Sequence, residues 1–232
     1  CIIDSGYDRS HEDLIGNAVT GEFDTRAGNW YDDQNGHGTH VAGTIAAVNN
    51  SGTGVVGVNP NRRVKLHIVK VFGAEGWAYS SDLATAANKC RAAGANIVSM
   101  SLGGETSSTT EKAAFDNLQA KGILSIAAAG NDGNTVVSYP AGYASVVMVG
   151  AVDEFKQWAS FSQYNSKVEL AGPGVGVLST VPMGSGSEGV LKVGTTTYVP
   201  GAMTGSPVKT ATAPLMDFGI GDRINTAASG KV

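Results

Sequence analysis

The sequence contains no run of apolar residues long enough to span a membrane, and it has no excess of positive charge. A membrane-spanning helix needs about 20 consecutive apolar residues, and nucleic-acid-binding domains are usually strongly basic. Here the net charge is -4, and charged residues make up only 16% of the 232 residues. We therefore expect a soluble protein with no membrane or nucleic-acid partner, long enough for one large domain or for a domain with part of another.

Cysteine is also scarce, because Cys1 and Cys90 allow at most one internal disulfide. Cys1 begins an apolar segment that is typical of a buried strand, and Cys90 shares a helical face with Leu83 and Ala86. Buried cysteines behave as small apolar side chains, so this pattern favours two free thiols over a disulfide. The chain also lacks an N-terminal signal sequence and opens inside a predicted strand, so we expect it to be a piece of a longer chain.

Glycine, by contrast, is abundant at 32 of 232 residues, which indicates many tight turns. Apolar runs of strand length alternate with segments of helical periodicity, a pattern that is typical of a parallel sheet covered by helices on both faces. We therefore predict a doubly wound α/β fold with a mostly parallel sheet for residues 1–182. The predicted strands are residues 1–3, 64–72, 96–101, 123–128 and 146–152, and the predicted helices are residues 37–48, 81–93 and 110–121.

The composition changes after Pro182. Residues 183–189 are rich in Gly and Ser, which is typical of a linker or a loop. Residues 191–232 contain short β-prone pieces, such as residues 195–199, between Pro and Gly turns. We expect a linker that leads into the beginning of a different, β-rich unit.

Polar side chains and glycines follow three of the predicted strands. Asp4 follows the first strand, Ser101-Leu102-Gly103-Gly104 ends another, and Ala129-Gly130-Asn131 follows a third. In open parallel sheets, ligands bind at the carboxyl ends of the strands. The fold should therefore bring a carboxylate, a glycine-rich edge and a carboxamide to one rim.

The helix that is predicted to begin at His37 adds an imidazole. Asn35 is a suitable cap, and a helix N-terminus disfavours the charged form of histidine, which predicts that His37 is neutral near pH 7 and able to accept a proton. An isolated histidine is more often structural, and we favour that interpretation for His40. An imidazole held by the buried carboxylate of Asp4 is a suitable general base, and the side-chain amide of Asn131 can donate to a developing oxyanion.

Four motifs follow one another along the chain. They are Ile3-Asp4-Ser5-Gly6, His37-Gly38-Thr39-His40-Val41-Ala42-Gly43, Ser101-Leu102-Gly103-Gly104 and Ala129-Gly130-Asn131. Their order resembles that of the subtilisin-like serine proteases (subtilases, peptidase family S8), from residue 1 to about residue 182. The resemblance implies that Asp4 is the triad carboxylate, His37 the general base and Asn131 the oxyanion-hole side chain.

The resemblance also implies a substrate cleft. Ser101-Leu102-Gly103-Gly104 would pair with the substrate backbone as an added strand, and Gly76-Trp77-Ala78 would form the opposite edge. The walls of the P1 pocket would be Ala128, Ala129, Gly130 and Ser138. Because these walls are small, we expect a preference for large apolar P1 side chains.

One part of the family's site is missing from the sequence. Subtilases carry their nucleophile in a Gly-Thr-Ser-Met-Ala-like segment at the start of a helix, and residues 1–232 contain no such segment. Gly205-Ser206-Pro207 is not a substitute, because no helical pattern follows it. Residues 191–232 instead resemble the beginning of a protease-associated domain, which some subtilases carry between the triad His and Ser. We expect the nucleophile C-terminal to Val232 and this chain alone to be inactive; the alternative is a pseudoprotease or peptide-binding module.

A calcium site is a further implication of the resemblance. Asp13 aligns with a calcium-binding carboxylate, and residues 48–55 resemble the loop that completes the site. The expected ligands are the side chains of Asp13 and Asn50 and the carbonyl oxygens of Val48, Thr53 and Val55, which suit a hard cation. The alternative is an ordinary Asn/Gly turn.

The remaining motifs carry less weight. Gly52-Thr53-Gly54-Val55-Val56-Gly57 matches a dinucleotide-binding pattern but does not open a helix, so we expect no organic cofactor. Asp32 and Asp33 are interpreted as solvated loop charges. From the family we expect polypeptide substrates, a propeptide or a proteinaceous inhibitor as further partners, secretion to the extracellular space and a monomer.

Overall fold

The computed structural model describes residues 1–186, 191–193 and 196–198, apart from residues 25, 51 and 53. The chain divides into two compact units, Cys1–Gly184 and Ser185–Val232. In the second unit, the described strands β8 (Leu191–Val193) and β9 (Thr196–Tyr198) pair antiparallel. The segment Gly205-Ser206-Pro207 and most of the predicted β-rich unit lie outside the described residues.

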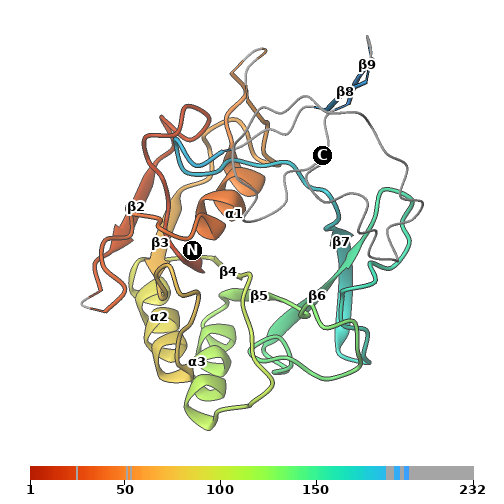
Figure 1. Cartoon of the computed structure of the whole chain (residues 1–232). Coiled ribbons are helices and arrows are strands. Elements are labelled where there is room, and N and C mark those ends of the chain that lie inside the picture. Colours follow the sequence, from red (N-terminus) through yellow and green to blue (C-terminus); the bar gives the residue numbers. More distant parts are fainter. Residues whose placement is uncertain (25, 51, 53, 187–190, 194–195, 199–232) are drawn as a thin grey trace. The chain divides into compact units, whose positions relative to one another are not determined.

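A seven-stranded parallel sheet forms the centre of the first unit, with the strand order β2-β3-β1-β4-β5-β6-β7 (Figure 1). The strands are β1 (Ile2–Asp4), β2 (Val19–Glu22), β3 (Leu66–Lys70), β4 (Ile97–Met100), β5 (Leu124–Ala128), β6 (Val146–Val152) and β7 (Val168–Pro173). The predicted α/β fold is confirmed, and all five predicted strands are present, with ends shifted by at most two residues. The edge strands β2 and β7 are additional to the prediction.

Three helices flank the sheet: α1 (His37–Ala46), α2 (Ser80–Ala92) and α3 (Thr109–Ala120). Each begins within one residue of its predicted start. Gly94 and Gly122, which follow α2 and α3, have φ angles of +75° and +74°. This left-handed conformation ends many helices and is most accessible to glycine, so these two residues stop the helices where the sequence predicted.

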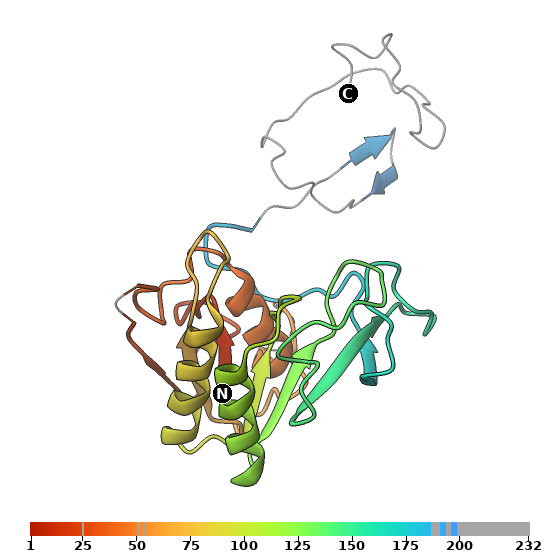
Figure 2. The same cartoon turned by 90° about the horizontal axis from the view of Figure 1, so that it is seen from below.

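The helices cover opposite faces of the sheet. Along β1, Ile3 packs in the core cluster that contains α2 and α3, whereas Ile2 packs with α1. Val69 and Ile68 of β3 divide in the same way. Because successive side chains of a strand point to opposite faces, α2 and α3 lie on one face and α1 on the other (Figure 2).

The face of β4 and β5 on the α1 side is not covered by a helix among the described residues. Val98 and Ala127 face α2 and α3, so Ile97 and Leu124 point the other way. These two residues are partners in the strand register and are 51% and 47% exposed. The same face holds a cavity of about 320 Å³, whose lining includes Ser99, Ile126, Ala128 and Val149. Parallel sheets are normally buried on both faces, so this surface is suited to being covered.

Cys1 and Cys90 form a disulfide, with 5.7 Å between their Cα atoms. The expectation of two free thiols is therefore wrong. Apolar neighbours predict burial, but a half-cystine is buried as readily as a thiol, and the sequence did not indicate that α2 packs beside β1. The bond joins the residue before β1 to a fully buried position of α2.

No described helix is both long enough and apolar enough to cross a membrane.

Candidate active site

Asp4 ends β1 and is completely buried. Its Oδ1 accepts a hydrogen bond from the Ser5 backbone N–H at 2.7 Å and lies 2.8 Å from Nδ1 of His37. The position at the carboxyl end of a central strand fixes the backbone, because Val71 of the neighbouring chain segment donates its N–H to the Asp4 carbonyl oxygen at 2.9 Å. The structure thus brings together the two residues that the sequence predicts as acid and base.

His37 is the first residue of α1, and its side chain is 45% exposed. With Nδ1 donating to Asp4, the neutral ring presents an Nε2 lone pair that can accept a proton. The hydrogen bond to Asp4 raises the pKa of His37, and partial burial, which lowers it, does not cancel this effect. The prediction from the helix N-terminus had the opposite sign; it was wrong because a carboxylate in contact acts more strongly on the imidazole than the end of a helix.

Asp33 holds the start of α1 in place. It is 8% exposed, and its carboxylate accepts hydrogen bonds from the backbone N–H of Gly36 (2.9 Å) and from the N–H and hydroxyl of Thr39 (2.8 and 2.6 Å). It also accepts from the hydroxyl of Ser5 at 2.8 Å, and the Ser5 hydroxyl oxygen in turn accepts from the Gly38 N–H. Asp33 therefore links the loop after β1 to the helix that carries the imidazole.

The interpretation of Asp33 as a solvated loop charge is wrong. Burial alone would raise the pKa of Asp33, but the hydrogen bonds from Thr39, Gly36 and Ser5 outweigh burial and lower it. Asn35, the predicted cap, contributes less: its Oδ1 accepts from the His37 N–H at 3.3 Å, and the N-cap position itself is Gly36. The sequence contains a signal for this capping role: Asp33 lies three residues before Gly36, which has no side chain that could cap the helix.

Asn131 follows β5, and its side chain is exposed. The turn before it requires glycine, since Gly130 has a φ of +113° and an added Cβ would lie 2.2 Å from Oε1 of Gln163. Gln163 is 2% exposed and braces this turn: it donates its N–H to the Gly130 carbonyl (3.2 Å), and its Oε1 accepts from the Asp132 N–H (3.1 Å). Sequence reasoning missed Gln163, which lies more than 30 residues away and matches no motif.

A cavity of about 240 Å³ lies beside Asn131. Its lining includes all of Ser101–Gly104 and three of the four predicted P1-wall residues, namely Ala128, Gly130 and Ser138. The fourth, Ala129, is 1% exposed and does not line this cavity. Gly104 and Tyr139 exchange backbone hydrogen bonds of 2.9 and 2.7 Å, so the predicted substrate edge is tied to the wall that contains Ser138.

The two predicted edges of the cleft face each other across a second cavity of about 170 Å³. Its lining includes Gly76, Trp77 and Ala78 on one side and Leu102, Gly103 and Gly104 on the other. Trp77 is 63% exposed and stacks edge-on against Tyr79, with 4.2 Å between the ring centroids. The structure therefore brings the predicted edges together, as the resemblance implied.

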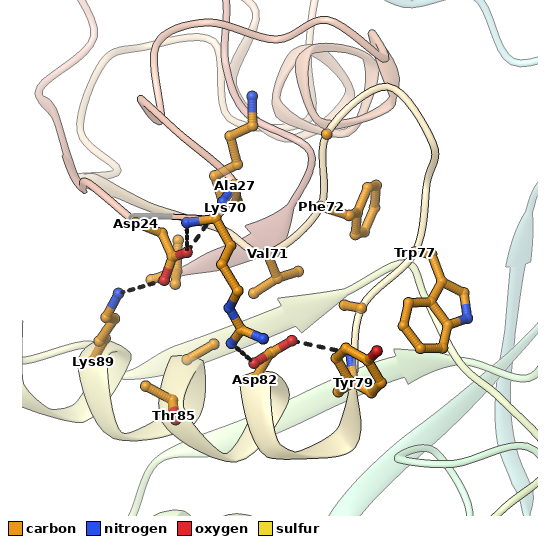
Figure 3. A pocket seen from close by; sticks show the side chains of 15 residues that line it. Asp24, Ala27, Lys70, Val71, Phe72, Trp77, Tyr79, Asp82, Thr85 and Lys89 are labelled. Carbon is orange, nitrogen blue, oxygen red and sulfur yellow. Dashed lines mark hydrogen bonds and ion pairs between the residues drawn. The ribbon is translucent and has the colours of Figure 1, made fainter.

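A third cavity of about 200 Å³ lies behind the Trp77 edge, between the turn after β2 and α2 (Figure 3). Its charged groups are paired: Arg26 contacts Asp82, and Lys89 lies 3.6 Å from Asp24. Lys70, which is 2% exposed, donates its ammonium to a backbone carbonyl, that of Asp32. The two ion pairs join the turn to α2, so the charged groups of this cavity have a structural role.

The predicted calcium ligands surround a buried carboxylate. Asp13 is 1% exposed; its Oδ1 accepts from the side-chain amide of Asn50 and its Oδ2 from the backbone N–H of Val55, both at 2.8 Å. Val48 donates its N–H to the Asp13 carbonyl oxygen at 2.8 Å. Thr53 lies outside the described residues. Within the described part of the chain, no cluster of three or more His, Cys, Asp or Glu side chains suits a metal ion.

Comparisons with known proteins point to one family. A model of the subtilase family matches residues 1–204. Subtilisin DY of Bacillus licheniformis is 45% identical over 186 residues, which cover 78% of this chain and 66% of that protein. Subtilisin E of Bacillus subtilis (strain 168) is 43% identical over 189 residues, which cover 79% of this chain and 48% of that protein.

A solved structure is similar over most of the described fold. The psychrophilic subtilisin-like protease Apa1 from the Antarctic psychrotroph Pseudoalteromonas sp. AS-11 matches with a TM-score of 0.77 and 53% identity, over 85% of this chain and 46% of that one. The chain thus spans between 46% and 66% of the length of these relatives.

Proposed function

The chain belongs to the subtilase family, and on that premise we propose that it supplies the acid, the base and the oxyanion donor of a serine endopeptidase. The observation that carries the proposal is the 2.8 Å hydrogen bond between Asp4 and His37. It lies at the carboxyl ends of the parallel strands, the same edge of the sheet as the cavity that Asn131 lines. In this reaction, His37 Nε2 removes the proton of a serine hydroxyl as the oxygen attacks the peptide carbonyl. The Asp4 carboxylate stabilises the imidazolium, which then protonates the leaving amine.

Asn131 is the proposed donor to the oxyanion of the tetrahedral intermediate. Its exposed amide follows a turn that Gly130 and Gln163 hold rigid, so the donor needs little reorganisation during the reaction. Loss of such a donor lowers kcat by about 100- to 1000-fold, a range that comes from a subtilisin itself. We expect Asn131→Ala to have an effect of this size in the complete protease.

We propose that the serine nucleophile lies in a part of the parent protein beyond these 232 residues. The sequence has no Gly-Thr-Ser-Met-Ala-like segment, and the α1 side of β4 and β5 has apolar surface that a further element can cover. On this proposal, the 232-residue chain binds polypeptides but does not cleave them. The substrate backbone pairs with Ser101–Gly104 as an added strand, and a large apolar P1 side chain enters the cavity beside Asn131.

Quenched fluorescent peptides test this function. The complete parent protein should cleave them, a serine-directed phosphonate inhibitor should block it, and His37→Ala should lower kcat/KM by at least about 1000-fold. His40→Ala is the matched control and should leave kcat/KM near the original value. Peptide binding without cleavage by the complete protein would favour the peptide-binding alternative. Cleavage by the 232-residue chain that His37→Ala abolishes would contradict the proposed place of the nucleophile.

We also propose that residues around Asp13 hold a structural calcium ion. The donors fit a hard cation: a carboxylate, the carboxamide of Asn50 and the carbonyl oxygens of Val48 and Val55. The amide nitrogen and oxygen of Asn50 are interchangeable by a flip, and an amide oxygen facing the Asp13 carboxylate would be stable only with a cation between them. Bound calcium would neutralise the buried charge and tie the loop to Asp13.

Thermal unfolding measures this effect. Tm should be several degrees lower in chelator than in excess calcium, because a ligand that binds only the folded state stabilises it. Asp13→Asn should remove most of this difference in Tm. In the unaltered chain, excess magnesium should not raise Tm to the value in calcium. Equal Tm values in chelator and in calcium would refute the metal site.

The disulfide supports secretion, because disulfides persist mainly in oxidising compartments. We therefore propose that the parent protein acts outside the cell on polypeptide substrates.

A further inference from the structure

A buried carboxyl group that the proposed reaction does not use lies beside the cleft. Glu111, in the first turn of α3, is only 2% exposed. Its Oε2 accepts a hydrogen bond of 2.7 Å from the hydroxyl of Tyr143. Within the described part of the chain, no Lys, Arg or His forms an ion pair with Glu111, and its Oε1 accepts no hydrogen bond.

This carboxyl group lines the cavity between the two edges of the cleft, Gly76–Ala78 and Leu102–Gly104. The other walls are mostly apolar or small, including Phe72 and Leu83, and Glu111 is the only acidic or basic side chain among the described residues of the lining. An ionised carboxyl in such surroundings is unfavourable unless a cation or several donors compensate it. Burial accordingly raises the pKa of Glu111. The cavity therefore has a carboxyl group but no cationic partner among the described residues.

The alternative role of Glu111 is to cap α3, since Ser108 and Glu111 have the spacing of a capping box. In that motif, the glutamate side chain accepts from the backbone N–H of the N-cap residue. Here the Ser108 N–H donates to the hydroxyl oxygen of Tyr143 at 2.8 Å. Tyr143 therefore accepts the hydrogen bond that a glutamate accepts in a capping box. Ser108 completes the cap by accepting from the Glu111 backbone N–H. The Glu111 side chain is not required for the cap.

We propose that Glu111 makes this part of the cleft a subsite for a basic side chain, lysine or arginine, of the polypeptide substrate. The inference rests on the proposed function. A substrate that pairs with Leu102–Gly104 in extended form sends alternate side chains to the same side. While one enters the P1 cavity, another reaches the space between the edges. The aliphatic stem of a lysine would pack against Leu83 and Leu102, and its ammonium would meet the carboxylate.

Peptides that differ at one position test the subsite in the complete protease. An apolar P1 residue is kept constant, and Lys, acetyl-lysine, norleucine or Glu is placed at each position from P2 to P5. At a single position, kcat/KM should be about 10-fold higher for Lys than for the neutral acetyl-lysine, since a hydrogen bond to a buried charged group is worth about that factor. The difference should lie mainly in KM.

Two variants assign the preference. Glu111→Gln keeps the shape and removes the charge, so it should abolish the difference between Lys and acetyl-lysine while changing kcat/KM for the norleucine peptide little. Glu75→Gln removes a charge from an exposed residue next to the opposite edge and should keep the preference. The comparison of Lys with acetyl-lysine in the unaltered protease holds even if Glu111→Gln fails to fold.

The outcomes separate the subsite from the reaction. Equal kcat/KM for Lys and acetyl-lysine at every position would overturn the subsite and leave the protease function standing. A preference for Lys that persists in folded Glu111→Gln would overturn the role of Glu111. No hydrolysis of any peptide would overturn the proposed function and, with it, the subsite.

Discussion

At the scale of single residues, Asp4 controls the ionisation of His37. Their 2.8 Å hydrogen bond raises the pKa of His37 more than burial lowers it. Asp4→Asn keeps the size of the side chain but removes its charge, so the pKa of His37 should fall. NMR titration of the histidine ring protons in the 232-residue chain measures this shift. Asp32→Asn, at an exposed neighbour, should leave the pKa unchanged; an unchanged value in Asp4→Asn would contradict the prediction.

The direction of this shift determines two pH dependences. Because the folded chain binds the His37 proton more tightly than the unfolded chain, the pair adds stability at pH values below the ordinary histidine pKa of about 6.5. That contribution is lost as pH rises through the higher folded pKa. Catalysis depends on pH in the opposite direction, since the neutral imidazole is the base. In the complete protease, kcat/KM should rise through the raised pKa, and Asp4→Asn should move this rise to lower pH.

Asp33 is expected to stabilise the fold through the start of α1. Asp33→Asn replaces an acceptor that takes four hydrogen bonds from Ser5, Gly36 and Thr39. The free energy of unfolding should fall by about 1–3 kcal/mol, the usual cost of leaving buried donors poorly satisfied. Urea unfolding of the 232-residue chain measures the change, with the exposed Asp32→Asn as control. Equal midpoints for the two variants would show that these bonds add nothing.

The same residues show what a sequence can indicate about a site. Asp4 and His37 could be predicted because each lies at the end of a regular element. Asp4 places a carboxylate at the end of an apolar strand, and His37 places an imidazole at the start of a helix. Gln163 could not be predicted, because its role depends on contacts that only packing creates. It donates to the Gly130 carbonyl oxygen, although β6 and the turns beside it separate the two residues in the sequence. For Asp33, the spacing before Gly36 indicates a helix cap, but it does not indicate the hydrogen bond from Ser5.

At the scale of elements, the disulfide connects the strand that carries Asp4 to α2. Cys1 and Cys90 close a loop with a sequence separation of 89, and removal of a native disulfide typically costs about 2–5 kcal/mol. Reductant should therefore lower the Tm of the 232-residue chain. The double variant Cys1→Ser with Cys90→Ser should be less stable and insensitive to reductant. If reductant left the Tm of the unsubstituted 232-residue chain unchanged, the disulfide would not contribute to stability.

Central and edge elements differ in how well the sequence predicts them. β1, β3, β4, β5 and β6 are mostly apolar, which is typical of the central strands of a parallel sheet. The edge strands β2 and β7 do not: Val19–Glu22 and Val168–Pro173 mix polar residues and glycine, and most of their residues are exposed or half-buried. These segments are strands because β2 pairs with β3 and β7 pairs with β6. The residue pattern of a single sequence does not show which segments will pair in this way.

At the scale of the whole molecule, the sheet of the first unit is covered unequally. The face that holds Val98 packs against α2 and α3, whereas Ile97 and Leu124 on the other face are about half exposed. A soluble parallel sheet rarely leaves such residues in water. On the proposed function, an element of the parent protein outside these residues covers this face.

Substitutions on the two faces distinguish a covered surface from an open one. In the 232-residue chain, Leu124→Lys should change the free energy of unfolding by less than about 0.5 kcal/mol, as at other exposed sites. Val98→Ala, on the covered face, should cost roughly 1–3 kcal/mol through lost burial. In the complete protein, Leu124→Lys should become destabilising to a similar degree, because the charge would then be buried under the added element. If Leu124→Lys were equally harmless there, that face would be open in the complete protein too, and the nucleophile would have to reach His37 from elsewhere.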